Sequence, residues 1–439
     1  MVNDQSRMVG QRSMGDGTSY PSSPPLTTGA PDSGDGVPYP LEAIYEYDRI
    51  DVELFDRPLE AGLERWQPLL PPLAPGTGLG EGNTPLVSVP DIASWVGLDA
   101  TVSGEADVYL KDESQNPTWS QKDRLNRVVV SAAVHEDAAG IVASSSGNHG
   151  AAAAAYAARA GLPCVIFTAP ETPAAVQEFI ASYGATVIAA TDDDARRRAV
   201  DRLADKYDYH PASSRTRPHT GHPYGPEGYK TIAYETYQQL GGRVPGAVFV
   251  PTCYAELFYG VWKGFRELDE LGVVDGTPRM VACEPAVRCP HAAALAEGKA
   301  PVTVDPTPTE AYSIKAVTSS HRGLQAIRES DGFAATFTEA ELADARERLA
   351  RCGHWQEDSG AAGVAGLHAT FFGEGETVGP DGATVDPDGN SIDPDEIDGP
   401  IVCIGTSSGF KNGRTREAPI IDGGWSEIRE ALVADGHSL

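Results

Sequence analysis

The sequence is short of positive charge. Its 439 residues contain 34 Lys and Arg against 63 Asp and Glu, a formal net charge of −29. Nucleic acids and anionic membranes attract positive potential, so this balance argues against either as a partner of the general surface. Carboxylates keep a surface hydrated when salt screens charge, so the acidic, lysine-poor composition predicts a salt-loving source organism.

The sequence also lacks paired cysteines and long apolar runs. Its six cysteines, at positions 164, 253, 283, 289, 352 and 403, include no C-x-x-C pair, which argues against a disulfide framework and a metal site. No run reaches the roughly 20 apolar residues of a membrane-spanning helix, and no secretory core is present. These absences predict a cytoplasmic protein. Methionines at positions 1, 8 and 14 each offer a possible start.

Regular structure is expected beyond a polar N-terminal segment. Residues 1–39 are rich in Gly, Ser, Pro and Asp and predict a disordered tail. From about residue 102, β-rich runs such as "GIVAS" alternate with helical runs such as "HGAAAAAYAARAG". This alternation predicts right-handed βαβ units on parallel sheets. The acidic, turn-rich residues 373–399 predict a solvated hairpin or loop insertion, because their spacing does not fit a Ca²⁺-binding loop.

Two polar stretches have the composition of a ligand site. In "SSSGNHG" (144–150), hydroxyls and the N–H groups of a helix start suit a carboxylate or phosphate, although an ordinary helix cap is the alternative. In "NPTWSQKDR" (116–124), Lys122 lies between turn residues and a helix. A partly desolvated lysine there can have a lowered pKa and form a Schiff base, although a surface ion pair is the alternative.

Several motifs together resemble one enzyme family. "LGEGNTPLV", "LKDESQNPTWSQKDR", "SSSGNHGAAAAAYAARAGL", "PEGYKTIAYE", "VWKGFRELDELG", "EDSGAAGVAGL" and "CIGTSSGFK" occur in the order found in fold type II, tryptophan synthase β-like pyridoxal-phosphate enzymes, most closely threonine synthase. The resemblance runs from about residue 79 to 411. It implies an α/β fold with two open, mostly parallel sheets and flanking helices. It implies a large cofactor-binding domain (40–126 and 224–439), a smaller α/β domain (127–223) and a homodimer.

The resemblance also implies roles for individual residues. Lys122 would hold pyridoxal 5'-phosphate as a Schiff base and move protons at the substrate Cα, and Asn148 would bond the ring hydroxyl. Thr406, or the neighbouring Ser407 or Ser408, would meet the pyridine nitrogen, and a hydroxyl there favours elimination or replacement over transamination. Around the substrate carboxylate we expect Ser145, Ser146 and His149. The cofactor phosphate would lie on the loop formed by Thr252, Cys253, Tyr254, Ala255 and Glu256.

The chain departs from the family pattern at three residues. Glu256 stands in the phosphate loop, where a carboxylate would repel a phosphate dianion unless it points away or a basic residue compensates. We expect it to point away. Trp119 and Gln121 replace the Gly and Phe of the usual "NPTGSFKDR", which indicates either a changed substrate or a repacked core.

Three functions remain open from the sequence. The first is replacement on a phosphorylated amino acid such as O-phosphohomoserine, as in threonine synthase, and the basic candidates for its phosphate are Arg124, Lys230, Lys315 and Arg322. The second is a serine/threonine dehydratase or related ammonia-lyase. The third is a non-catalytic protein that binds the cofactor or an amino acid.

Overall fold

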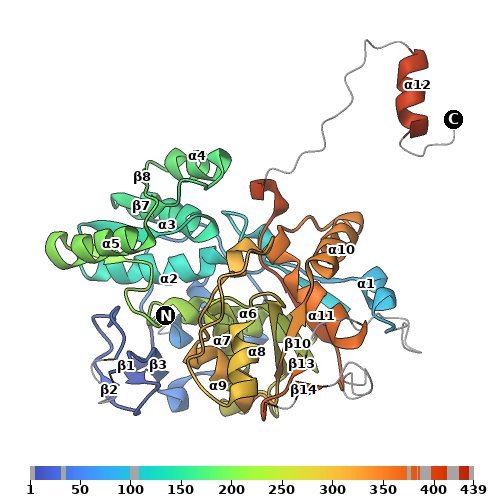
Figure 1. The fold of residues 1–439 in the computed structure, drawn as a ribbon. Coiled ribbons are helices and arrows are strands. Elements are labelled where there is room, and N and C mark those ends of the chain that lie inside the picture. The colour runs from blue at the N-terminus through green and yellow to red at the C-terminus, as the bar shows by residue number, and fades with distance from the viewer. Residues whose placement is uncertain are drawn as a thin grey trace.

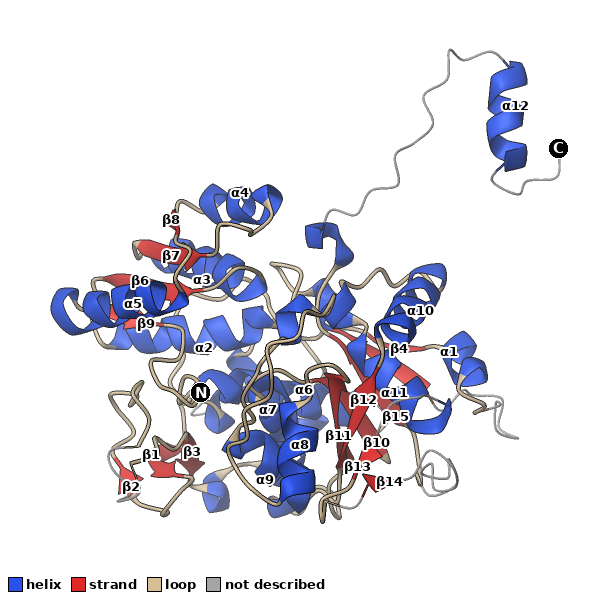
Figure 2. Ribbon diagram, in the orientation of Figure 1, coloured by secondary structure: helices blue, strands red, loops and turns tan. Residues whose placement is uncertain are grey.

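The chain folds into an α/β structure with three sheets (Figures 1 and 2). This computed structural model describes residues 5–30, 36–98, 108–372, 377–382, 384–385, 397–412 and 425–434. Two of the sheets are open, are built mainly from parallel strands and carry flanking helices, so the predicted fold class is confirmed.

The larger sheet has eight strands in the order β14-β13-β12-β11-β10-β15-β5-β4. Its central strands β12, β11, β10, β15 and β5 run parallel, whereas β4, β13 and β14 join the edges antiparallel. The bounds are β4 (Leu86–Ser88), β5 (Val108–Asp112), β10 (Ala247–Pro251), β11 (Arg279–Pro285), β12 (Phe333–Phe337), β13 (Thr377–Val378), β14 (Thr384–Val385) and β15 (Ile401–Gly405).

Helices cover both faces of this sheet, which is why its strands β10 and β15 are apolar throughout. On one face lie α7 (Glu256–Glu270), α8 (Pro290–Glu297) and α9 (His321–Glu329). On the other lies α11 (Ala362–Phe372), backed by α10 (Glu339–Arg351). Alternate residues of β10 follow this division, because Val248 and Val250 join the first core and Phe249 joins the second.

The smaller sheet has four parallel strands in the order β8-β7-β6-β9. They are β6 (Gly140–Ser144), β7 (Cys164–Thr168), β8 (Thr186–Ala189) and β9 (Tyr209–Pro211). Helix α3 (Asn148–Ala160) covers one face and α5 (Asp193–Tyr207) the other, while α4 (Ala174–Ser182) packs against α3 and β8.

Helix α2 (Lys122–His135) connects the two parallel sheets. It packs against α3 of the smaller sheet and against α6 (Gly225–Gln239), which in turn packs on α7 of the larger one. The expected domain boundary after residue 126 falls inside α2. The division into residues 40–126 with 224–439 and residues 127–223 therefore stays a prediction.

The expectation of a disordered N-terminal tail is wrong for its described part. Strand β1 (Met8–Ser13) pairs with β2 (Ser19–Tyr20) and β3 (Leu41–Tyr45) in the third, antiparallel sheet. The buried Gln11 amide donates to Pro21 O and Pro24 O, and its oxygen accepts from Leu26 N. These bonds satisfy backbone groups of the turn-rich loop after β2. Composition alone did not reveal this ordering.

The remaining elements lie around these sheets or beyond them. In the acidic segment, β13 and β14 form the expected hairpin, but Thr377 and Val378 are buried rather than solvated, and residues 373–376, 383 and 386–396 lie outside the described residues. No described helix is long and apolar enough to cross a membrane. The other helices are α1 (Pro90–Trp95), α12 (Trp425–Ala434) and 3-10 turns at Tyr47–Arg49, Val52–Asp56, Glu64–Leu69, Glu113–Gln115, Tyr312–Ile314, Asp358–Gly360 and Gly409–Asn412.

Candidate active site

Lys122 is the first residue of α2 and lies where several strands end. Its Nζ donates a hydrogen bond of 3.0 Å to the hydroxyl of Tyr229 on α6. The chain just before it is fixed to the carboxyl end of β15, because Gln121 N donates to Thr406 O at 3.0 Å and Ser120 forms a bridge with Ser407. The predicted convergence of Lys122 with the end of β15 is therefore present.

The charge on Lys122 is stabilised in this state of the protein. Burial disfavours the ammonium form, but the Tyr229 hydroxyl and the Glu256 carboxylate outweigh it and raise the pKa of Lys122. Burial therefore acts in the expected direction, but the net pKa is raised and not lowered because of these two partners. Lys122 must lose its proton before it can act as a nucleophile.

The loop after β6 brings its polar residues to the same place. Ser145 Oγ accepts from Gly147 N at 3.3 Å and Gly150 N at 2.9 Å, so it caps the start of α3. Ser146 Oγ accepts from Ala169 N at 3.2 Å and Thr168 Oγ1 at 3.3 Å. Both hydroxyls serve the loop as acceptors, which is the ordinary capping role, and both keep an O–H to donate.

His149 lies beside Lys122 in a neutral state. Its Nδ1 is 3.3 Å from Asn126 Nδ2 on α2. Burial, together with the nearby Lys122 charge, lowers the pKa of His149 to about 4. At neutral pH this imidazole is therefore uncharged and can donate or accept one hydrogen bond in the site.

The Asn148 side chain connects the β6 loop to the C-terminal part of the chain. Its Nδ2 donates to Glu357 Oε1 at 3.1 Å, and its Oδ1 accepts from Lys411 Nζ at 2.6 Å. Lys411 is 6% exposed, and burial lowers its pKa to about 8. Burial also raises the pKa of Glu357. Asn148 thus lies between an acidic and a basic group whose pKa values burial shifts toward each other.

The loop after β10 forms a tight turn into α7. Ala255 adopts a left-handed conformation, φ 59°, immediately before the helix begins at Glu256. The first N–H groups of a helix have no partner within the helix, so this turn offers backbone donors at the positive end of a helix dipole. Tyr254 is held aside by stacking on His219, with ring centroids 4.0 Å apart.

Glu256 is turned toward the loop before α6 rather than left in solvent. Its Oε1 accepts from His222 N at 3.3 Å. Burial raises the pKa of a carboxyl, but His219, Lys122 and Arg322 outweigh burial and keep the pKa of Glu256 below its usual value. The carboxylate therefore has both a backbone partner and compensating positive charge.

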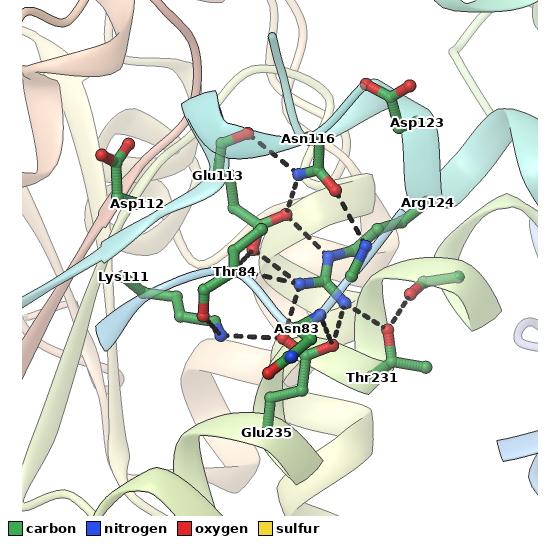
Figure 3. Close-up of polar contacts among 12 residues, drawn as sticks. Asn83, Thr84, Lys111, Asp112, Glu113, Asn116, Asp123, Arg124, Thr231 and Glu235 are labelled. Carbon is green, nitrogen blue, oxygen red and sulfur yellow. Dashed lines mark hydrogen bonds and ion pairs between the residues drawn. The ribbon is translucent and has the colours of Figure 1, made fainter. Parts of the chain in front are cut away.

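Three of the four candidates for a substrate phosphate are already bound to other groups of the protein. Arg124 is completely buried and binds Glu113 and Glu235, with Nε to Glu113 Oε2 at 2.7 Å and Nη1 to Glu235 Oε1 at 2.6 Å (Figure 3). Lys230 pairs with Glu227 at 2.7 Å and Glu267 at 2.9 Å. Arg322 donates to two backbone carbonyls, and Lys315 is exposed. The ordinary ion-pair role is correct for Arg124 and Lys230.

Trp119 and Gln121, which depart from the family pattern, differ in exposure. Trp119 is 46% exposed and stacks on Phe179 of α4, so it is not part of the core. Its φ of 62° explains why the family pattern has glycine there. Gln121 is buried, and its Oε1 has no hydrogen-bond partner among the described residues.

The residues present fit pyridoxal phosphate. A nucleophilic amine, a helix start able to bind a phosphate and the Asn148 amide converge from α2, α7 and the β6 loop, and the Thr406 backbone adjoins Lys122. No cluster of ligands able to hold a metal ion occurs among the described residues. Three neighbours were not assigned roles from the sequence: Tyr229, Glu357 and Lys411. All three lie in the quoted motifs, and the scarcity of lysine was a signal for Lys411.

Comparison with known proteins gives the class. The family described as pyridoxal-phosphate dependent enzyme matches residues 77–379. The threonine synthase of Methanosarcina acetivorans is 30% identical over 409 residues, covering 89% of this chain and 92% of its own. That of Synechocystis is 33% identical over 311 residues, covering 70% and 76%. The chain belongs to the pyridoxal-phosphate dependent enzyme family.

Solved structures show the same fold. Maize serine racemase aligns with a TM-score of 0.61 at 20% identity, over 81% of this chain and 94% of its own. Diaminopropionate ammonia lyase from Escherichia coli aligns with a TM-score of 0.60 at 16% identity, over 82% and 90%. With the threonine synthase relatives, these place the chain among fold type II enzymes. It is a threonine synthase-like, pyridoxal-phosphate-dependent lyase.

Proposed function

We propose that the protein catalyses replacement on O-phosphohomoserine, with water entering as phosphate leaves, and that Lys122 is the residue that binds the cofactor and moves the substrate protons. The observation that carries this proposal is the position of Lys122 Nζ, next to Tyr229 and within the electrostatic reach of Glu256 and His149. The bound cofactor would supply an electron sink for negative charge at the substrate Cα. The threonine synthase relatives support this reaction over others.

Each site residue has one task in this proposal. Thr252, Cys253, Tyr254, Ala255 and Glu256 form the turn whose backbone N–H groups would hold the cofactor phosphate. Asn148 would orient the ring through its amide, and Thr406 would place a hydroxyl near the ring nitrogen. Ser145 and Ser146 would donate their O–H groups to the substrate carboxylate, since both hydroxyls are used only as acceptors in the loop. Neutral His149 would add a hydrogen bond beside them.

The leaving phosphate needs a positive partner, and Lys411 is the described candidate that remains. It is buried and donates to Asn148 Oδ1 at 2.6 Å. Its lowered pKa means that an approaching dianion would favour the charged form.

A second function has a specific observation in its favour. Arg124 and Lys230 are held in buried ion pairs and are not available to a phosphate. The carboxylates of Glu256 and Glu357 lie near Lys122 and Asn148. This balance suits an ammonia-lyase, whose leaving group needs no cation. The non-catalytic alternative rested on the altered loop, and that loop retains a helix start with free N–H groups.

A substrate panel separates these functions. The purified protein, loaded with cofactor, should show a visible absorbance band that borohydride bleaches and that Lys122→Ala lacks. With O-phosphohomoserine we expect phosphate and threonine to appear. Release of ammonia and a 2-oxo acid from serine, threonine or diaminopropionate, with none from O-phosphohomoserine, would establish the lyase instead. A colourless protein that takes up no cofactor would overturn both.

Four broader properties belong to the same proposal. We propose a homodimer in the cytoplasm of a salt-loving organism, with an amino-acid substrate. The net charge of −29 supports the habitat, because such a surface is stabilised when salt screens its repulsion. Sedimentation and activity should therefore be measured from low to molar KCl, and a protein that is most stable at low salt would contradict the habitat.

A further inference from the structure

Tyr229 is the direct hydrogen-bond partner of the reactive lysine, and no role has been given to it. Its hydroxyl oxygen is 3.0 Å from Lys122 Nζ. Among the described residues, neither Lys122 Nζ nor the Tyr229 hydroxyl makes another side-chain hydrogen bond. The contact therefore belongs to the reacting nitrogen itself.

Three other buried tyrosines have a carboxylate as their partner. Tyr45 donates to Glu227 at 2.8 Å, Tyr156 donates to Glu81 at 2.8 Å, and Tyr234 donates to Glu267. Each carboxylate accepts the phenolic proton, which satisfies the group and fixes it structurally. A lysine ammonium can only donate, so Tyr229 must accept through its oxygen. Its own O–H then remains free to donate into the site.

Close packing of three helices holds Tyr229 in place. A Cβ added to Gly228 would collide with Arg124 O, so α6 and α2 touch beside Lys122. A Cβ added to Gly260 would lie 2.6 Å from Pro226 O and 2.6 Å from the Tyr229 Cβ, so α7 touches α6 at this tyrosine. Tyr229 is completely buried between them. The position of Tyr229 beside Lys122 is thus fixed by close backbone contacts of α6 with α2 and α7.

We propose that Tyr229 is a second catalytic residue, which stabilises the charged form of Lys122 and delivers a proton to the group that leaves the substrate. Resting on the proposed function, Lys122 as the neutral amine takes the proton from the substrate carbon, and the C–H electron pair stays with the substrate. The leaving group departs with its bonding pair and receives the Tyr229 proton. The phenolate then recovers a proton from the Lys122 ammonium. One proton has moved from carbon to the leaving group, and nothing is oxidised or reduced.

The protonation states agree with this order. Burial, offset in part by Lys122, raises the pKa of Tyr229 to about 12. The phenol therefore carries its proton at neutral pH. Because Lys122 lies next to it and has a raised pKa of its own, the ammonium is a nearby source from which that proton can be replaced.

The first test needs no turnover. In the cofactor-free protein, acetylation of Lys122 by acetic anhydride is followed by mass spectrometry from pH 7 to 11, which reports the pKa of this amine. Tyr229→Phe should shift the labelling curve to lower pH by about one unit, a tenfold change in the amine fraction. Tyr237→Phe, a half-buried tyrosine on the same helix without contact to Lys122, should leave the curve in place.

The second test uses the loaded enzyme. General acid–base groups contribute roughly 10²–10⁴-fold to rate, so Tyr229→Phe should lower kcat at least tenfold with KM little changed. Tyr229→Gln, whose amide oxygen can still accept from Lys122, should keep the labelling curve near its original pH but not restore kcat. An unshifted labelling curve in Tyr229→Phe with kcat within twofold of the original would overturn the inference.

Failure of the proposed function has a different signature. If Lys122→Ala binds and retains the cofactor as the original protein does, Lys122 is not the attachment residue and the proposed function fails. If Lys122 attaches the cofactor and the original protein turns over, but Tyr229→Phe behaves like Tyr237→Phe in both tests, only the role of Tyr229 fails.

Discussion

The indole of Trp119 stacks on the phenyl ring of Phe179, with ring centroids 5.4 Å apart and planes 9° apart. Trp119 lies three residues before Lys122, and Phe179 lies on α4 beside the smaller sheet. The stacking thus connects the Lys122 segment to a helix of the smaller sheet. Because Trp119 is 46% exposed, a repacked core does not describe its position.

Trp119 should be easier to replace by glycine than by alanine. At φ 62° an alanine keeps the cost of the left-handed conformation, whereas glycine removes it, which is worth roughly 1 kcal/mol. Both variants lose the stacking on Phe179. We therefore expect Trp119→Gly to be about 1 kcal/mol more stable than Trp119→Ala in urea unfolding. Equal midpoints would show that the left-handed turn carries no strain.

Arg124 should be structural and not a phosphate ligand. Arg124→Lys loses the paired hydrogen bonds to Glu113 and Glu235 and leaves buried carboxylates poorly neutralised, which costs about 3–5 kcal/mol. The free energy of unfolding in urea measures this loss. In the fraction that stays folded, KM for O-phosphohomoserine should be unchanged. A large rise in KM without loss of stability would return Arg124 to the list of phosphate ligands.

Glu256 should not be needed for cofactor binding. Glu256→Gln keeps an oxygen for His222 N and removes a negative charge near the helix start that would hold the phosphate. Spectrophotometric titration should give unchanged or tighter cofactor affinity. The variant should also lower the pKa of Lys122, because one of the two groups that raise it is lost. A large loss of affinity would mean that the carboxylate has a positive role in binding.

Asp123 should make stability depend on pH between about 4 and 7. Burial raises the pKa of Asp123 to about 7, although Thr118 donates to it through N and Oγ1. The folded state binds this proton more tightly than the unfolded state, so the contribution is complete below about pH 4 and is lost as pH rises through 7. Asp123→Asn keeps a neutral group throughout.

The measurement for Asp123 is a difference between two proteins. The free energy of unfolding of Asp123→Asn minus that of the original should increase by a few kcal/mol between pH 4 and pH 7, since one pKa unit is about 1.4 kcal/mol. Groups common to both proteins cancel in this difference. A difference that stays flat across the window would show that Asp123 titrates normally.

A chain that starts at position 14 should be much less stable than one that starts at position 8. The later start removes β1, with it the Arg12–Glu42 ion pair at 2.8 Å and the buried Gln11 amide. The backbone groups that the Gln11 amide binds would lose their partner, and a buried polar group left unpaired costs about 1–3 kcal/mol. Thermal unfolding of the two versions should differ by several degrees, and equal midpoints would show that β1 is dispensable.

The sequence by itself determined the βαβ framework and singled out Lys122 as the proposed cofactor-binding residue. Strands such as β6 and β10 follow from continuous apolar runs, and the ordered motifs place their loops at the carboxyl ends of parallel strands. These are local patterns, and each can be read from a few neighbouring residues. The two edge strands of the acidic hairpin and the N-terminal sheet were harder, because two-residue strands and polar runs carry almost no periodic signal.

Only the tertiary structure decided which charges meet. Arg124 stands two residues from Lys122, yet its guanidinium is bound to Glu113 and to Glu235, a residue 111 positions away. Asn148 meets Lys411 across 263 positions, and Lys122 meets Tyr229 across 107. Ionisable side chains are long and can face either way from the same backbone, so their partners depend on how helices pack. In this protein that packing is set by glycines such as Gly228 and Gly260, which bring α2, α6 and α7 together around Lys122.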